Sequence, residues 1–217
     1  IRHYLHANPE LSLEEFNTSE LVAGKLAEWG YQVTRGLGKT GVVGSLSKGD
    51  SPRTIGLRAD MDALPIHETT DLPWASTVPG KMHACGHDGH TTILLAAAKY
   101  IASPACQFNG TVHLIFQPAE EAIGGADLMI KDGLFEQFPC ERIFGLHNMP
   151  GLPVGKLGFY AGNFMASADT VKITITGYGG HGAHPERTVD PIVAGAALVM
   201  ALQSIVARNV PPGETAV

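Results

Sequence analysis

Short β-rich runs alternate with helix-forming segments along most of the chain, and this alternation constrains the fold more than any other feature. Glycine and polar turns bound the β-rich runs, and helix-forming segments lie between the later ones. Strands that alternate with helices are typical of an α/β sheet with parallel segments. The predicted strands are residues 31–37, 41–46, 54–59, 110–117 and 141–148, and the predicted helices between them are 89–103 and 125–135.

A further helix is predicted near the start of the sequence, within "LSLEEFNTSELVAGKLAEWG" (residues 11–30). Ser12 and Glu15 have the spacing of a capping box, in which each side chain bonds a free backbone N–H group of the first turn. The apolar residues that follow share one face, and Gly30 is the residue type that most often ends a helix. The pattern therefore predicts a capped helix that packs on the sheet.

The pattern changes after residue 163 and indicates a second domain of α+β type. "DTVKITITG" (169–177) alternates strictly between apolar and polar residues, which predicts a half-exposed strand. A glycine-rich loop follows, and then a buried helix with Asp190 as N-cap and Pro191 at its first position. We expect residues 1–163 to form the larger domain and residues 164–217 to begin the second, with the remainder of that domain missing.

Charge and cysteine content exclude several classes of function. The formal net charge is −6, and the basic residues form no stripe, so nucleic-acid binding is not expected. No apolar run reaches the 18 or so residues of a membrane-spanning helix, so we expect no membrane partner. Three cysteines at unrelated spacings are no disulfide framework, which favours a reducing, cytoplasmic location.

Polar residues that could perform chemistry follow three of the predicted strands. In open α/β sheets, functional groups gather outside the carboxyl ends of the strands. The segment "MHACGHDGHTT" (82–92) precedes a predicted helix and reaches the same edge. Cysteine, histidine and carboxylate side chains together form the ligand set of a divalent transition metal. The groups brought to this edge are Asp60, Asp62, Cys85, His87, Glu120, Glu121 and His147.

The spacing of Cys85 and His87 suits a metal ion, because Gly86 between them permits an unusual backbone angle. A closed structural site would require a second short-spaced Cys/His pair, and Cys106 and Cys140 offer none. The predicted site is therefore open and catalytic. One carboxylate of the adjacent glutamates can bind the ion while the other accepts a proton from water, and the sequence alone does not assign the two roles.

Each of these residues also has an ordinary structural interpretation. A pair of glutamates is most often solvated, a single histidine is often a core residue, and a free cysteine is usually an inert buried thiol. Four such coincidences at one edge are less plausible than one metal site. Two functional alternatives remain: a cysteine hydrolase with Cys85 as nucleophile, and a metal-binding fragment without catalytic activity.

Five motifs, in this order, resemble the bacterial N-acyl-amino-acid amidohydrolases, a family with hippurate hydrolases, auxin-conjugate hydrolases, carboxypeptidases and aminoacylases. They are "RADMDALPI", "GKMHACGHDGHTT", "FQPAEE", "GLHN" and "GGHGAHPE". The resemblance implies a mixed-sheet metallohydrolase (phosphorylase/hydrolase-like) domain with an inserted α+β lid and dimerisation domain. It also implies two divalent ions (zinc, manganese, cobalt or nickel), an N-acyl amino acid substrate and a homodimer formed through the lid.

The resemblance also implies a role for individual residues. The metal ligands would be Cys85, His87, Glu121 and His147. Glu120 would be the general base and Asp62 would orient the site, while His181 of the lid would bind substrate and stabilise the oxyanion. A further histidine ligand of the family belongs to a C-terminal part of the catalytic domain, which we expect to be missing here.

Overall fold

A computed structural model of the 217-residue chain describes residues 1–162, 165, 167–214 and 216. The chain divides into two compact units, Ile1–Pro150 and Gly151–Val217. The boundary that the sequence predicts, between residues 163 and 164, lies outside the described residues.

The first unit is built on a five-stranded mixed sheet with the strand order β1-β2-β4-β3-β5. The pairs β1–β2 and β2–β4 are antiparallel, whereas β4–β3 and β3–β5 are parallel. The predicted α/β sheet with parallel segments is therefore confirmed. The strands are β1 (Gln32–Leu37), β2 (Gly41–Lys48), β3 (Thr54–Asp60), β4 (Gly110–Gln117) and β5 (Arg142–Gly145).

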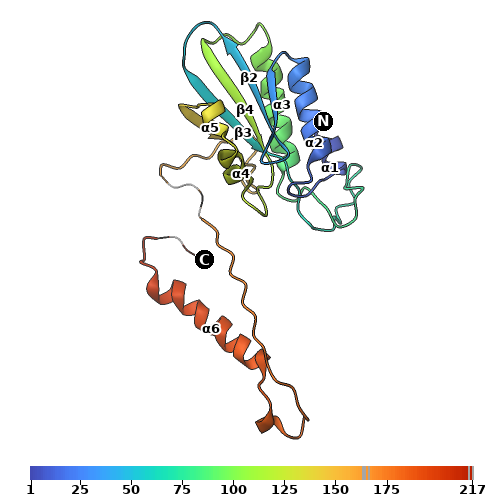
Figure 1. Cartoon of the computed structure of the whole chain (residues 1–217), viewed down its shortest axis with the longest axis vertical. Coiled ribbons are helices and arrows are strands. Elements are labelled where there is room, and N and C mark those ends of the chain that lie inside the picture. Colours follow the sequence, from blue (N-terminus) through green and yellow to red (C-terminus); the bar gives the residue numbers. More distant parts are fainter. Residues whose placement is uncertain (163–164, 166, 215, 217) are drawn as a thin grey trace. The chain divides into compact units, whose positions relative to one another are not determined.

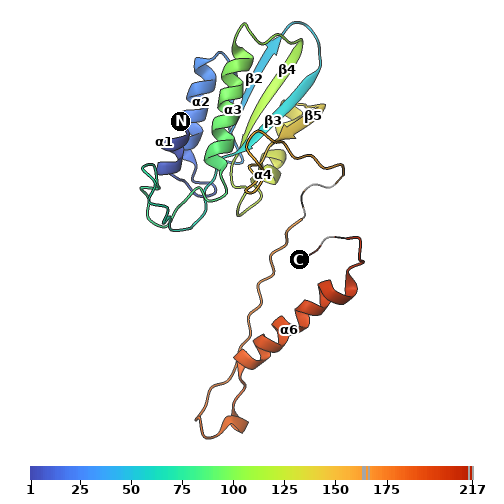
Figure 2. The same ribbon diagram turned by 180° about the vertical axis from the view of Figure 1, so that it is seen from behind.

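Helices cover both faces of this sheet (Figures 1 and 2). The larger core lies between strands β2, β3 and β4 on one side and helices α2 and α3 on the other. It includes Leu26, Leu95 and Phe116, which are all fully buried. A smaller core lies on the other face, where Met129 of α4 and Leu134 of α5 pack on the sheet. The helices of this unit are α1 (Arg2–Ala7), α2 (Phe16–Glu28), α3 (His87–Ala102), α4 (Gly125–Lys131) and α5 (Leu134–Gln137).

The parallel strands bring their carboxyl ends to one edge of the sheet. Asp60 at the end of β3 is in register with Gln117 at the end of β4. On the other side of β3, Arg58 is in register with Gly145 at the end of β5. The segments that follow these three strands therefore begin side by side, as the sequence predicts.

The predicted capping box of the first long helix is wrong. Helix α2 begins at Phe16, and its N-cap residue Glu15 makes no capping hydrogen bond. The Glu10 carboxylate caps the first turn instead, because it accepts the backbone N–H groups of Asn17 and Thr18 at 3.0 Å and 2.8 Å. Ser12 instead donates a hydrogen bond to Asp62, and the buried Glu15 carboxylate accepts from Thr40 and from the backbone of Ala119. The side chains of Ser12 and Glu15 therefore form hydrogen bonds with residues distant in sequence, and not with the backbone at the start of α2.

The second unit contains the predicted helix cap but not the predicted strand. Asp190 accepts hydrogen bonds from the first turn of α6 (Pro191–Asn209), which follows the short helix η1 (Pro185–Arg187). Residues 169–177 form no strand, because among the described residues of this unit the only β-bridge joins Tyr178 to Val189. A strand requires a hydrogen-bonded neighbour over its length.

The prediction that α6 is a buried helix is also wrong. No residue of α6 is buried, because the described part of its unit contains no sheet face to cover it. Among the described helices, α6 is the one that is long and apolar enough to cross a membrane. Length and composition of this kind are shared with core helices of soluble proteins, so they do not distinguish the two environments.

Candidate metal centre

Seven residues have a role implied by the resemblance, and the edge of the sheet brings six of them together. The seventh, His181, belongs to the second unit. Three groups of side chains could each hold a metal ion, since the ligand atoms within each group lie within 4.8 Å of one another. His87 belongs to all three groups and is therefore central. The groups are Cys85, His87 and His147; His87, Glu120 and Glu121; and Asp60, His87 and His90.

His87 lies in the first turn of α3, which begins two residues earlier than predicted. The preceding Gly86 is the N-cap and has φ +93°, a left-handed conformation that favours glycine. His87 Nδ1 lies 2.8 Å from the backbone carbonyl oxygen of Asp62 and donates to it. The Nε2 lone pair consequently faces the site, as in histidines that bind metals through Nε2.

The side chains of Cys85, which precedes α3, and His147, which follows β5, lie close together at the carboxyl edge of the sheet. The Cys85 Sγ atom lies 3.3 Å from His147 Nε2. His147 Nδ1 donates to the carbonyl oxygen of Asn148 at 2.7 Å, so Nε2 keeps its lone pair for the site. Burial, together with the nearby carboxylates of Glu121, Asp60 and Glu120, raises the pKa of Cys85 to about 12. A bound cation would oppose this effect by stabilising the thiolate.

The glutamate pair is held in place by its backbone. The N–H groups of Glu120 and Glu121 each donate to the Asp62 carboxylate at 3.0 Å. Ala119, just before the pair, has φ +50° and donates its own N–H to Glu15 at 2.8 Å. Two buried carboxylates from elsewhere in the chain therefore fix the turn that carries Glu120 and Glu121.

Burial and neighbouring polar groups shift the pKa values of three side chains at this edge. Burial would raise the pKa of Asp62, but hydrogen bonds from His87, Ser12 and two backbone N–H groups lower it. Burial and the charge of Glu121 raise the pKa of Glu120. Burial would lower the pKa of His87, whereas its bond to Asp62 and the surrounding carboxylates raise it.

Two orphaned atoms show that these residues fit a metal ion. His87 Nε2 and Glu121 Oε1 are buried without a hydrogen-bond partner and lie 3.7 Å apart. Buried polar atoms are almost always paired, so two unpaired buried acceptor atoms this close together indicate a site for a cation. A thiol, two imidazoles and two carboxylates with free lone pairs are the donor set of zinc and related ions.

Two residues beside this centre were not identified from the sequence. His90, one turn of α3 beyond His87, bonds Asp60 through Nδ1 at 2.7 Å. Asn148 donates its backbone N–H to His90 Nε2 at 3.1 Å. The three-residue spacing of His87 and His90 on one helix face is the signal that could have revealed the first of them.

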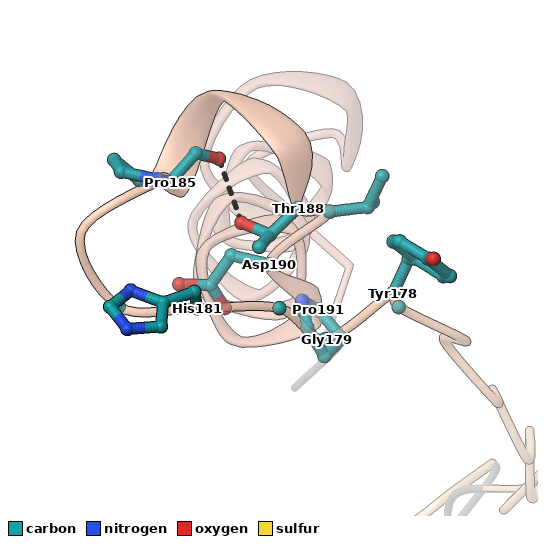
Figure 3. Close-up of a pocket in the computed structure, with 11 residues that line it drawn as sticks. Tyr178, Gly179, His181, Pro185, Thr188, Asp190 and Pro191 are labelled. Carbon is teal, nitrogen blue, oxygen red and sulfur yellow. Dashed lines mark hydrogen bonds between the residues drawn. The ribbon is translucent and has the colours of Figure 1, made fainter.

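His181 lies in the second unit, in a glycine-rich loop that lines a pocket of about 470 Å³ (Figure 3). Asp190 and Pro191 at the start of α6 line the same pocket. The His181 Nδ1 atom accepts the backbone N–H of Ala183 at 3.1 Å. The ring proton therefore resides on Nε2, which makes His181 a hydrogen-bond donor at that atom.

The mixed sheet carries a Cys/His/Glu cluster at its carboxyl edge, and these residues could hold a metal ion. The sequence model of Peptidase family M20/M25/M40 matches residues 56–216. The chain belongs to this family, which confirms the resemblance found in its motifs.

Two curated relatives match the chain over its whole length. It is 57% identical over 217 residues to the hippurate hydrolase of Campylobacter jejuni, with 100% of the chain and 56% of the relative covered. It is 45% identical over 217 residues to the N-acetyl-L-cysteine deacetylase of Bacillus subtilis, with 100% and 52% covered. The chain therefore spans about half the length of these relatives.

Solved structures agree with the fold. A protein of methicillin-resistant Staphylococcus aureus assigned as an aminohydrolase superposes with a TM-score of 0.80 at 36% identity, over 99% of this chain and 57% of that chain. The Bacillus subtilis YxeP protein, described as a dinuclear metal-binding peptidase of the M20 family, gives a TM-score of 0.66 at 43% identity. That match covers 71% of this chain and 43% of YxeP.

Proposed function

We propose that the protein containing this chain is a metal-dependent amidohydrolase that cleaves the amide bond of N-acyl amino acids. The observation that carries the proposal is the pair of orphaned buried atoms, His87 Nε2 and Glu121 Oε1, within a cluster of thiol, imidazole and carboxylate groups. The names of the hippurate hydrolase and N-acetyl-L-cysteine deacetylase relatives support the substrate class, since both act on N-acyl amino acids.

In this proposal, four side chains hold the metal: Cys85, His87, Glu121 and His147. Bound divalent ions (zinc, manganese, cobalt or nickel) supply Lewis acidity at the scissile carbonyl group and make water easier to deprotonate. The description of YxeP as dinuclear supports two ions.

The remaining residues handle the proton and the substrate. Glu120 is the more exposed of the two glutamates, with 43% of its side chain accessible against 20% for Glu121, so it is free to meet a water molecule. It takes a proton from the attacking water and delivers it to the leaving amine. Asp62 orients His87 and the glutamate turn, and the Nε2–H group of His181 stabilises charge on the carbonyl oxygen.

The same proposal includes residues 1–163 as part of the catalytic domain and residues 164–217 as the beginning of a lid and dimerisation domain. The exposed apolar surface of α6 supports a homodimer formed through this region. Three free cysteines support a cytoplasmic location.

Two alternatives predict different inhibition. The contact between Cys85 Sγ and His147 Nε2 has the partners of a cysteine nucleophile and its base, and such an enzyme would be insensitive to chelators. A metal-binding fragment without catalytic activity would bind zinc and hydrolyse nothing.

The test is hydrolysis of hippurate and N-acetyl amino acids by the protein that contains this chain, with added Zn²⁺ or Mn²⁺ and with chelator. We expect metal-dependent release of the amino acid, and a loss of at least about 100-fold in kcat for Glu120→Gln. Glu141→Gln is the matched control and should keep full activity, because Glu141 is an exposed carboxylate just before β5. Activity that survives chelation, or that Glu120→Gln leaves unchanged, would contradict the proposal.

A further inference from the structure

His90 links two segments that are far apart in the sequence. Its Nδ1 atom donates to the Asp60 carboxylate of β3 at 2.7 Å. On the other side of the ring, Nε2 accepts the backbone N–H of Asn148 at 3.1 Å, and the side-chain Oδ1 atom of Asn148 lies 2.5 Å from the same nitrogen. A buried imidazole therefore connects the end of β3 to the loop that carries His147.

The loop after β5 has few other attachments. Residues 143–150 are all exposed, so little packing holds His147 in place. The loop instead approaches the N-terminus of α3 very closely: a Cβ atom on Gly86 would lie 2.5 Å from Asn148 Oδ1. Asn148 therefore fits between His90 and the backbone that joins Cys85 to His87.

His90 could in principle be a metal ligand itself, because it forms a group with Asp60 and His87. Its hydrogen bonds argue otherwise. Both ring nitrogens of His90 already have hydrogen-bond partners. In His87 and His147, by contrast, Nδ1 donates to a backbone carbonyl group, which leaves the Nε2 lone pair available to a metal ion. Outer-shell hydrogen bonds of this kind orient metal ligands, and their loss typically lowers metal affinity about 10–100-fold.

We propose that His90 is a positioning residue that couples the Asp60 carboxylate to Asn148 and thereby sets the separation of the Cys85 and His147 ligands. This inference rests on the metal site of the proposed function. It requires no ligand from His90 itself.

The experiment is a Co²⁺ titration of the 217-residue chain. Binding is monitored by the charge-transfer absorption band that a bond between the Cys85 thiolate and cobalt produces. We expect His90→Ala to raise the Kd for cobalt about 10–100-fold. Asn148→Ala, at an exposed position, should weaken binding in the same direction without affecting the thermal unfolding of the metal-free chain. His90→Gln should recover part of the affinity, because its amide oxygen can accept the Asn148 N–H.

His113→Gln is the matched control, since His113 is also buried and bonded through one ring nitrogen, to Ser45, but belongs to none of the possible metal groups of the described residues. Wild-type affinity in both His90→Ala and Asn148→Ala would overturn the inference and leave the metal site intact. A cobalt spectrum that loses a nitrogen ligand at saturation in His90→Ala would also overturn it, because His90 would then be a ligand. If the unmodified chain gives no thiolate band, the metal site itself fails and the inference falls with it.

Discussion

Glu15 offers the sharpest test of how the glutamate turn is supported. Its carboxylate is fully buried and accepts two hydrogen bonds, from Thr40 Oγ1 at 2.5 Å and from Ala119 N at 2.8 Å. Each hydrogen bond to a charged group contributes about 1.5–3 kcal/mol, and removing the acceptor leaves both buried donors without a partner. Truncation also relieves the cost of burying the carboxylate, which offsets part of the loss.

We therefore expect Glu15→Ala to lower the free energy of unfolding by about 2–4 kcal/mol. Glu15→Gln retains the shape and one acceptor oxygen and should lose about half as much. Because Ala119 would be released from its φ of +50°, Glu15→Ala should also weaken zinc binding.

The assay is urea unfolding of the metal-free chain, followed by circular dichroism. Glu14→Ala is the matched control, because Glu14 is exposed and forms only a surface ion pair with Lys81. Such pairs contribute at most about 1 kcal/mol. If Glu15→Ala and Glu14→Ala unfold at the same urea concentration, the structural role assigned to Glu15 is wrong.

Three further predictions concern metal, backbone and pH. Zinc at about 100 times its Kd should stabilise the chain by about 2.7 kcal/mol, measured by urea unfolding with and without chelator, and Cys85→Ser should reduce this gain; equal stability in both conditions would argue against a site. Gly86→Ala should weaken zinc binding, measured by calorimetry, because alanine is strained at φ +93° and its Cβ atom would lie only 2.5 Å from Asn148 Oδ1. An unchanged zinc affinity would contradict this prediction. Burial lowers the pKa of His113 below its ordinary 6.5, so the unfolded chain binds the proton more readily. The stability of the native chain relative to His113→Gln should therefore fall as pH decreases from 6.5 through the folded pKa, and parallel pH profiles would contradict this.

The sheet and its site could be predicted because the relevant signals are local or follow from parallel topology. Strands β3, β4 and β5 are recognisable from short apolar runs, and their parallel pairing brings Asp62, Glu121 and His147 to one edge. Periodicity also located α3, although the helix begins early enough to include His87.

The errors arose where distant partners override a local pattern. Ser12 and Glu15 have capping-box spacing, but their side chains form hydrogen bonds with Asp62 and Ala119, which are distant in sequence. Nothing near Ser12 or Glu15 in the sequence indicates those contacts. Residues 169–177 have the alternation of a strand, yet the described residues of their unit supply no neighbouring strand to pair with them.

The most direct test of the metal centre is X-ray absorption at the zinc edge of the zinc-loaded chain. The proposed ligands predict one sulfur scatterer at about 2.3 Å, from Cys85, with nitrogen and oxygen scatterers at about 2.0–2.2 Å. The sulfur contribution should disappear in Cys85→Ser. A zinc environment of nitrogen and oxygen alone in the unmodified chain would contradict the proposed ligand set.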